Sequence, residues 1–250
     1  MAALAYPLLP TYNVTGDSMD STKLKRRADD TLLFRVLPLG ASITYGTASS
    51  HGNGYRKALR DLMTSAGHEV NMIGSRHGGT MKDNENEGWP GFTITQVHDK
   101  AKTQYPVRPN LVLINAGTND CNRNQQDAIA KGAQRMENMV RDIFNNIPGA
   151  TVILSGLLPN KNRDKCTKSL NDQYGQIVER LARDGENIVF ANTYGHFTLG
   201  DLADGTHPTD AGYVKLAGIW WEAVRVAIQR DFISEPHDWR GPGGDDTKVV

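Results

Sequence analysis

Only two cysteines occur in this chain, and neither sign of charge is in excess. Its 28 Lys and Arg residues balance its 28 Asp and Glu residues, whereas a nucleic-acid-binding protein usually carries a basic excess. No apolar run approaches the ~20 residues of a membrane-spanning helix. A cysteine-based metal site would need more such ligands than two cysteines supply. What remains is a chain of 250 residues, enough for one α/β domain with a full core and tails.

The two ends of the chain differ in composition from the rest. Residues 1–30 open with the apolar residues 1–9, which have no charged start and are broken by Pro7, so they make a poor signal peptide. An N-terminal arm and the remnant of a leader fit this segment equally well. Residues 233–250 contain few core-forming side chains and several Pro and Gly, so we expect a loose tail. The folded domain is therefore expected to span residues 31–232.

Strand-like and helix-like segments alternate along this domain. The clearest strand, residues 111–115, is apolar without alternation, which is typical of parallel strands covered on both faces. The expected strands are residues 32–39, 70–74, 111–115, 151–154 and 187–191, and the expected helices are residues 55–66, 93–105, 125–145, 168–183 and 211–230. This alternation predicts a three-layer α/β/α domain around a five-stranded parallel sheet. Right-handed crossovers favour the flavodoxin-like strand order 2-1-3-4-5.

Ser42 is the candidate nucleophile. It follows the strand at residues 32–39, and the small Gly40 and Ala41 before it allow a tight turn. In open parallel sheets, ligands bind beyond the carboxyl ends of the strands. Asn119 follows the neighbouring strand in the expected order, so the two side chains should face each other across one crevice. A serine after a strand is more often an ordinary loop residue, and the chain has no Gly-x-Ser-x-Gly elbow of an α/β-hydrolase.

A carboxylate and an imidazole lie three residues apart at Asp204 and His207. This short link allows the carboxylate to bind the imidazole Nδ1–H while Nε2 points at a serine hydroxyl, as in a Ser-His-Asp triad. The alternative is N-terminal capping of the following helix, although Thr209 or Asp210 can also provide that cap. The expected catalytic residues are therefore Ser42, Asp204 and His207.

Four blocks of the chain follow one another in the order found in the SGNH hydrolases, and they contain Ser42, Gly91, Asn119 and His207. Over residues 32–230 the chain resembles this superfamily of GDSL-like esterases. The resemblance implies the SGNH hydrolase fold. It also implies an oxyanion hole made by the backbone N–H groups of Ser42 and Gly91 and the side-chain amide of Asn119.

The nucleophile block departs from the common superfamily pattern. Residues 40–43 read Gly-Ala-Ser-Ile instead of Gly-Asp-Ser-Leu, a change that is common in the carbohydrate-active branch. The wider sequence at residues 88–94 and 204–210 resembles family 3 of the carbohydrate esterases, whose members deacetylate xylan and related sugars. Gly88 is the rival for the oxyanion glycine, but only Gly91 has the Gly-Phe-Thr-Ile context that resembles the family block.

Three aromatic residues near these blocks, Tyr45, Trp89 and Phe92, are expected to rim the substrate pocket, because flat amphipathic rings suit sugar faces. Core packing is the commoner role of such residues. Glu85 and Glu87 are expected to be solvated loop charges rather than ligands for a cation or for sugar hydroxyls. No cofactor and no metal is implied.

Cys121 and Cys166 each follow a predicted strand, and these two strands are neighbours in the expected order. Their loops should therefore meet at the rim of the site. A Cys121–Cys166 disulfide there would fit an exported protein. The alternative is two free, unrelated thiols.

These features favour a secreted serine carboxylic-ester hydrolase that removes small acyl groups, above all acetyl, from carbohydrate such as acetylated xylan. Ser42 would carry the acyl-enzyme, the substrate would be an acylated small molecule or polysaccharide, and a monomer is expected. One alternative is a short-chain lipid or aryl esterase of the same superfamily, although the polar, glycine-rich loops at residues 46–54 and 74–87 offer no wide apolar cleft. Another is a non-catalytic carbohydrate-binding module on an esterase scaffold, which the complete set of site residues disfavours.

Overall fold

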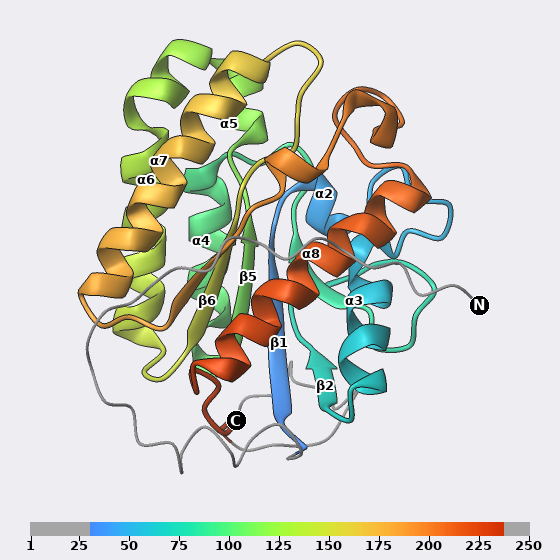
Figure 1. Ribbon diagram of the computed structural model, residues 1–250, viewed down its shortest axis with the longest axis vertical. Coiled ribbons are helices and arrows are strands. Elements are labelled where there is room, and N and C mark those ends of the chain that lie inside the picture. The colour runs from blue at the N-terminus through green and yellow to red at the C-terminus, as the bar shows by residue number, and fades with distance from the viewer. Residues whose placement is uncertain (1–30, 238–250) are drawn as a thin grey trace.

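A mostly parallel β-sheet runs through the computed structural model of the chain, which describes residues 31–237 (Figure 1). Its strands are β1 (Leu33–Gly40), β2 (Glu69–Met72), β3 (Arg76–His77), β4 (Glu85–Gly88), β5 (Leu111–Asn115), β6 (Thr151–Ser155) and β7 (Ile188–Ala191). The α-helices of the described part are α2 (Ser42–Tyr45), α3 (Gly54–Ser65), α4 (Ile94–Gln104), α5 (Thr118–Arg123), α6 (Gln125–Asn146), α7 (Asp164–Arg183) and α8 (Asp210–Gln229). Short 3₁₀ turns complete the set at Tyr105–Val107, Tyr194–His196 and Leu199–Asp201.

The five strands expected from the sequence lie in the order β2-β1-β5-β6-β7 and are parallel. This is the flavodoxin-like order expected from the sequence, so the fold class is confirmed. The expected count of five strands is wrong, because two short strands extend the sheet. β3 pairs antiparallel with β4, and β4 pairs with Leu39 and Gly40 at the end of β1, beyond the point where β2 stops. These strands of two and four polar residues are too short to produce a recognisable pattern.

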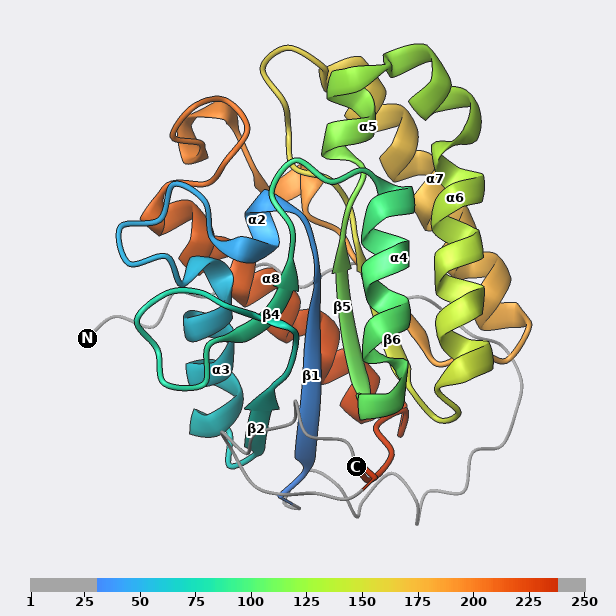
Figure 2. The ribbon, with the colours of Figure 1, turned by 180° about the vertical axis from the view of Figure 1, so that it is seen from behind.

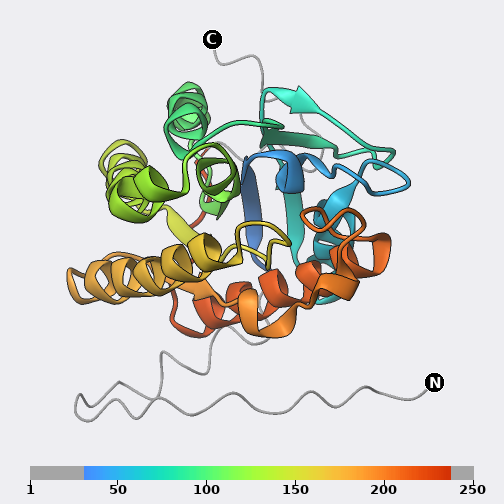
Figure 3. The ribbon, with the colours of Figure 1, turned by 90° about the horizontal axis from the view of Figure 1, so that it is seen from above.

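Helices cover both faces of this sheet, as Figures 1 and 2 show from opposite sides. On β1, Phe34 and Val36 pack into one core with side chains of α3 and α8, while Leu37 and Leu39 pack into the other with α4, α6 and α7. The alternation of side chains along a strand explains this division. Figure 3 looks onto the carboxyl ends of the strands, where the short helix α2 and the connecting loops gather.

The expected helices are present within about one turn of their predicted bounds. Two short helices, α2 and α5, were not predicted, and both lie just beyond the carboxyl end of a strand. Within α3, Leu59 and Met63 are fully buried, whereas 38% of the surface of Leu62 is exposed. None of the described helices combines the length and the apolar character needed to cross a bilayer.

The C-terminal boundary also differs from the expectation. The first residues of the supposed loose tail pack on the domain: Ile233 is buried, the carbonyl of Ser234 accepts a hydrogen bond from the Asn110 side chain, and that of His237 accepts one from Arg35. The tail expected at residue 233 is therefore wrong for residues 233–237. The N-terminal arm and the rest of the tail lie outside the described residues.

Candidate active site

Ser42 is the first residue of α2, immediately after β1. A glycine is required two residues earlier, because a Cβ at Gly40 would lie 2.3 Å from both the Asn115 carbonyl oxygen and the Thr44 Oγ1. This close packing sets the turn that presents the Ser42 hydroxyl at the carboxyl end of the sheet. The first residues of a helix have no intrahelical acceptor for their N–H groups, so the Ser42 N–H is available to a ligand.

The structure brings Asp204 and His207 to this serine, although they lie more than 160 positions further along the chain. Nε2 of His207 lies 2.9 Å from Oγ of Ser42, and Nδ1 lies 2.7 Å from Oδ2 of Asp204. The other carboxylate oxygen of Asp204 accepts hydrogen bonds from the backbone N–H groups of Thr206 and His207. The carboxylate therefore orients the ring, and the ring reaches the hydroxyl, as a triad requires.

These contacts also control the charge of the carboxylate. Partial burial acts to raise the pKa of Asp204, but the hydrogen bonds from the backbone and ring of His207 and from Thr206 outweigh it and lower the pKa. Asp204 consequently stays ionised at neutral pH, which favours the imidazolium that forms when His207 accepts a proton.

The loop that carries Gly91 is held by side chains of α5. The amide nitrogen of Asn119 donates to the Phe92 carbonyl oxygen at 2.9 Å, and the guanidinium of Arg123 donates to the Gly91 carbonyl oxygen at 2.7 Å. Because an amide group carries two N–H donors, Asn119 keeps one for a ligand. Gly91 has φ = +82°, a left-handed conformation that favours glycine, and a Cβ there would meet no atom within 4 Å. Backbone conformation, not lack of space within the protein, accounts for this glycine.

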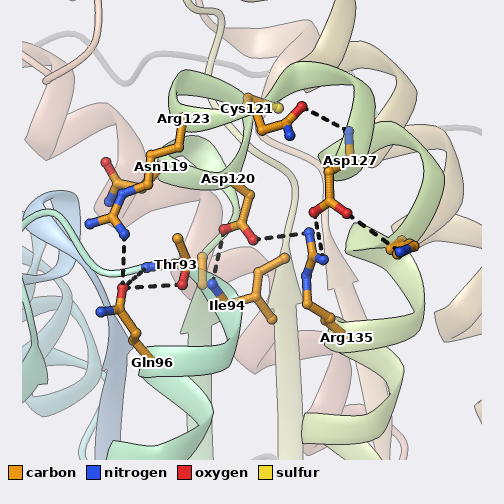
Figure 4. Close-up of polar contacts among 12 residues, drawn as sticks. Thr93, Ile94, Gln96, Asn119, Asp120, Cys121, Arg123, Asp127 and Arg135 are labelled. Atoms are coloured by element: carbon orange, nitrogen blue, oxygen red, sulfur yellow. Dashed lines mark hydrogen bonds and ion pairs between the residues drawn. The ribbon is translucent and has the colours of Figure 1, made fainter.

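A buried carboxylate fastens the same loop to the helices behind it (Figure 4). Asp120 accepts a hydrogen bond from the Ile94 N–H at the start of α4, and it pairs with Arg135 of α6 at 3.3 Å. Burial raises the pKa of Asp120, while the Ile94 N–H and the Arg135 guanidinium act in the opposite direction. Asp120 thus supports the loop that carries Gly91.

The bridge between Cys121 and Cys166 is present, with 5.7 Å between the two Cα atoms. The expected pairing is confirmed, but the two cysteines lie in α5 and α7 rather than in loops. Both are fully buried. The disulfide therefore braces α5, the helix that carries Asn119 and Arg123, against a long helix of the same core.

A buried arginine that the sequence interpretation missed organises the loops around α2. Arg56 of α3 is fully buried and donates to five backbone carbonyl oxygens, those of Thr44, Tyr45, Gly52, Gly78 and Asn84. Desolvation lowers its pKa, and nearby tyrosines, with Tyr55 first, act to raise it. The sequence feature that could have indicated its burial is its position three residues before Leu59, on the apolar stripe of α3.

The three expected rim aromatics do lie together, and two cations lie among them. The Trp89 ring stacks on Phe92 with 5.3 Å between centroids, and Lys100 Nζ lies 4.1 Å from the Trp89 centroid. The guanidinium of Arg76 lies over Tyr45 and over Trp89. Neither Arg76 nor Lys100 was singled out from the sequence, since a lone cation carries no local signal.

Glu87 is not the solvated charge that was expected. It is fully buried, and its carboxylate accepts hydrogen bonds from the Ser75 N–H, the Ser75 hydroxyl and the Trp89 indole N–H. A buried carboxylate needs such donors to offset its desolvation. Glu87 therefore fixes the orientation of the Trp89 ring.

Comparisons with known proteins agree with this geometry. Residues 39–215 match the GDSL-like Lipase/Acylhydrolase family. A curated relative, a multidomain esterase from Ruminococcus flavefaciens, is 25% identical over 221 residues, and the match covers 76% of this chain but only 28% of the relative. This chain thus spans little more than a quarter of that protein.

Solved structures of similar proteins include a family 3 carbohydrate esterase from Clostridium thermocellum. It is 26% identical, with a TM-score of 0.71, over 81% of this chain and all of that chain. A family 3 carbohydrate esterase from Talaromyces cellulolyticus, at 23% identity and a TM-score of 0.65, covers 80% of this chain and 99% of its own and shares the fold. With more than half of its length matched, the chain belongs to the GDSL-like lipase/acylhydrolase family and is a serine ester hydrolase.

Proposed function

We propose that this enzyme removes small acyl groups, above all acetyl, from carbohydrate esters, with Ser42 as the nucleophile. The observation that carries the proposal is the continuous chain of contacts from the Asp204 carboxylate through His207 to the Ser42 hydroxyl, 2.7 Å and 2.9 Å long at its two links. The side chains of His77 and His98 have hydrogen bonds to Asn84 and Asp142, respectively, rather than to a serine hydroxyl.

The reaction then proceeds in two acyl transfers. The Ser42 oxygen attacks the ester carbonyl carbon while His207 accepts the hydroxyl proton, and the tetrahedral oxyanion forms next to the N–H donors of Ser42, Gly91 and Asn119. As the intermediate collapses, the C–O bond to the sugar breaks and His207 protonates the departing oxygen. Water activated by the same imidazole cleaves the acyl-enzyme and releases the acid.

The proposal of a carbohydrate substrate rests on the aromatic residues at the rim of the site and on similar proteins of known structure. Tyr45, Trp89 and Phe92 lie around the loop beside the proposed oxyanion donors, and aromatic rings of this kind suit sugar faces. Two solved structures with the same fold are described as family 3 carbohydrate esterases. Acetylated xylan is therefore the first polymer to test.

We also propose that the protein is secreted, because its disulfide suits an oxidising compartment. We further propose that it is monomeric, which size-exclusion chromatography with light scattering tests.

The test of the mechanism uses 4-nitrophenyl acetate and two pairs of variants. Ser42→Ala and His207→Ala are expected to lower kcat by several orders of magnitude, because removal of a triad member leaves only a residual ~10³–10⁴-fold acceleration over water. The matched controls are Ser65→Ala and His196→Ala, at exposed positions on the same chain, which should retain activity. Near-normal turnover by folded Ser42→Ala would refute this mechanism.

The substrate proposal needs a separate panel. Acetylated xylan, cellobiose acetate and acetylated chitin oligomers should be compared with 4-nitrophenyl esters from acetate to octanoate. We expect rates to fall steeply with acyl length. A maximum at octanoate would instead assign the enzyme to lipid esters.

A further inference from the structure

An arginine in contact with two aromatic rings lies at the rim of the proposed site. The guanidinium carbon of Arg76 is 4.5 Å from the centroid of the Tyr45 ring and 4.6 Å from that of Trp89. The Trp89 ring is itself fixed by its hydrogen bond to the buried Glu87. We refer to Tyr45, Arg76 and Trp89 as the arginine clamp. Cation–π contacts of this kind restrain the arginine without neutralising its charge.

The clamp leaves the hydrogen-bond donors of Arg76 unused. A cation–π contact involves the charge of a guanidinium and does not consume its five N–H donors. Within residues 31–237, no hydrogen bond or ion pair is formed by the Arg76 guanidinium, and none of its nitrogens is among the buried atoms that lack a partner. These donors are therefore in contact with solvent and available to a ligand.

The surroundings of the clamp are positively charged. Lys100 lies over the Trp89 ring, and Arg123 donates to the Gly91 carbonyl oxygen, yet in the described part of the chain neither forms an ion pair with a carboxylate. The nearby acids are already engaged: Glu87 accepts from Ser75 and Trp89, Asp99 pairs with Lys102, and Asp120 pairs with Arg135. An anion at this rim would meet three cations and no free carboxylate.

The clamp is also adjacent to the groups proposed to perform acyl transfer. Tyr45 lies one helical turn after Ser42 in α2, and Trp89 lies two residues before Gly91. The backbone of Gly88, the residue before Trp89, packs directly on that of Tyr45, since a Cβ on Gly88 would lie 2.4 Å from the Tyr45 nitrogen. A sugar ester bound at Ser42 would therefore place its neighbouring sugar units within reach of Arg76.

We propose that the arginine clamp binds the carboxylate of an acidic sugar unit next to the acylated one, so that the preferred substrate is an acetylated, uronic-acid-bearing oligosaccharide. The planar fork of a guanidinium matches a carboxylate with two parallel hydrogen bonds, and the fixed rings reduce the freedom lost on binding. This inference rests on the proposed function and specifies, in addition, that the preferred substrate is negatively charged.

The test compares xylo-oligosaccharides that carry xylose acetates and a glucuronic acid branch with the same oligosaccharides, bearing the same xylose acetates, in which that carboxyl is reduced to a free primary alcohol. We expect kcat/KM to be about tenfold higher for the acidic form, the size of one hydrogen-bonded charge pair, and the preference to shrink as salt rises. Arg76→Met should abolish the preference, and Arg76→Lys should retain part of it, since it keeps the charge but loses the fork. Arg225→Met, a remote surface variant paired with Glu222, should leave the ratio unchanged.

A second measurement separates binding from folding and from chemistry. The Ser42→Ala protein should bind the acidic oligosaccharide more tightly than the reduced one in calorimetry, and adding Arg76→Met should remove that difference. Equal kcat/KM for the two substrates in the parent enzyme would overturn the proposal, as would a preference that survives Arg76→Met. Either result would leave the esterase function intact, because that function depends on loss of 4-nitrophenyl acetate turnover in Ser42→Ala.

Discussion

Removal of the Cys121–Cys166 bridge should affect both the stability and the turnover of this enzyme. The bridge joins residues 45 positions apart, and the chain-entropy relation for a loop of this length gives about 4 kcal/mol of stabilisation at 25 °C. For a chain of this size, 1 kcal/mol corresponds to roughly 2–4 °C in Tm. The double variant Cys121→Ala, Cys166→Ala is therefore expected to melt about 8–16 °C lower, and the loss of two buried sulfurs adds to the effect.

The effect on turnover follows from what α5 carries. Asn119 and Arg123 hold the Phe92 and Gly91 carbonyls, and the bridge fixes α5 to α7. Complete loss of one oxyanion donor costs ~10²–10³ in kcat, so a helix that is loosened but present should cost less than that. We expect kcat on 4-nitrophenyl acetate to fall by about three- to tenfold, measured well below the lower Tm.

Three measurements decide this prediction. Denaturant unfolding gives the free-energy difference, steady-state kinetics gives kcat, and thiol titration of the unfolded, unreduced parent protein counts free cysteines. Two free thiols per chain would refute the bridge. A lower Tm with unchanged kcat would refute the coupling between the bridge and Asn119 while leaving the bridge in place.

Further substitutions probe the contacts around the site. Arg123→Met should lower kcat about fivefold with little change in Tm, because it removes one exposed charge-assisted hydrogen bond to the Gly91 carbonyl; an unchanged kcat would show that this contact does not position the loop. Arg56→Met should lower the free energy of unfolding by at least about 3 kcal/mol, because it leaves buried carbonyls without donors; denaturant unfolding tests this. Asp204→Asn should lower the free energy of unfolding at pH 7, and this deficit should shrink as pH falls below about 4. The sign follows from the lowered folded-state pKa of Asp204: the stabilisation by its carboxylate is fully present above the ordinary pKa and is lost as pH falls through the lower folded-state pKa. A deficit that does not shrink on acidification would contradict it.

The parts of this molecule that the sequence predicted are those that depend on neighbours in the chain. The order of the five long strands follows from strand–helix alternation and crossover handedness, and Asp204 and His207 were paired because only three positions separate them. Both arguments use short-range patterns. The structure satisfies them because the Asp204 carboxylate also accepts backbone N–H groups of its own turn, so local hydrogen bonds orient the carboxylate toward His207.

The features that were missed depend on contacts between distant segments. Glu87 sits in a polar, glycine-rich stretch that resembles a solvated loop, yet it is buried because Ser75 and Trp89 supply its donors. Arg56 is buried because carbonyls of α2 and of two separate loops converge on it. α2 and α5 are too short for periodicity to detect. For Glu87 and Arg56, at least one of the partners that stabilise the buried charge lies in another segment of the chain.

The two sides of the proposed site are therefore held in different ways, and this difference has a kinetic consequence. Local hydrogen bonds of one turn orient the imidazole of His207, whereas the Gly91–Asn119 side depends on α5, on Asp120 and on the disulfide. A perturbation of α5 should weaken stabilisation of the oxyanion while the imidazole stays in place. The acyl-enzyme should then still form on Ser42, but formation and hydrolysis, which both pass through an oxyanion, should slow together. Pre-steady-state bursts of 4-nitrophenol should accordingly keep their amplitude in the disulfide variant, and a lost burst with a normal steady-state rate would contradict this division.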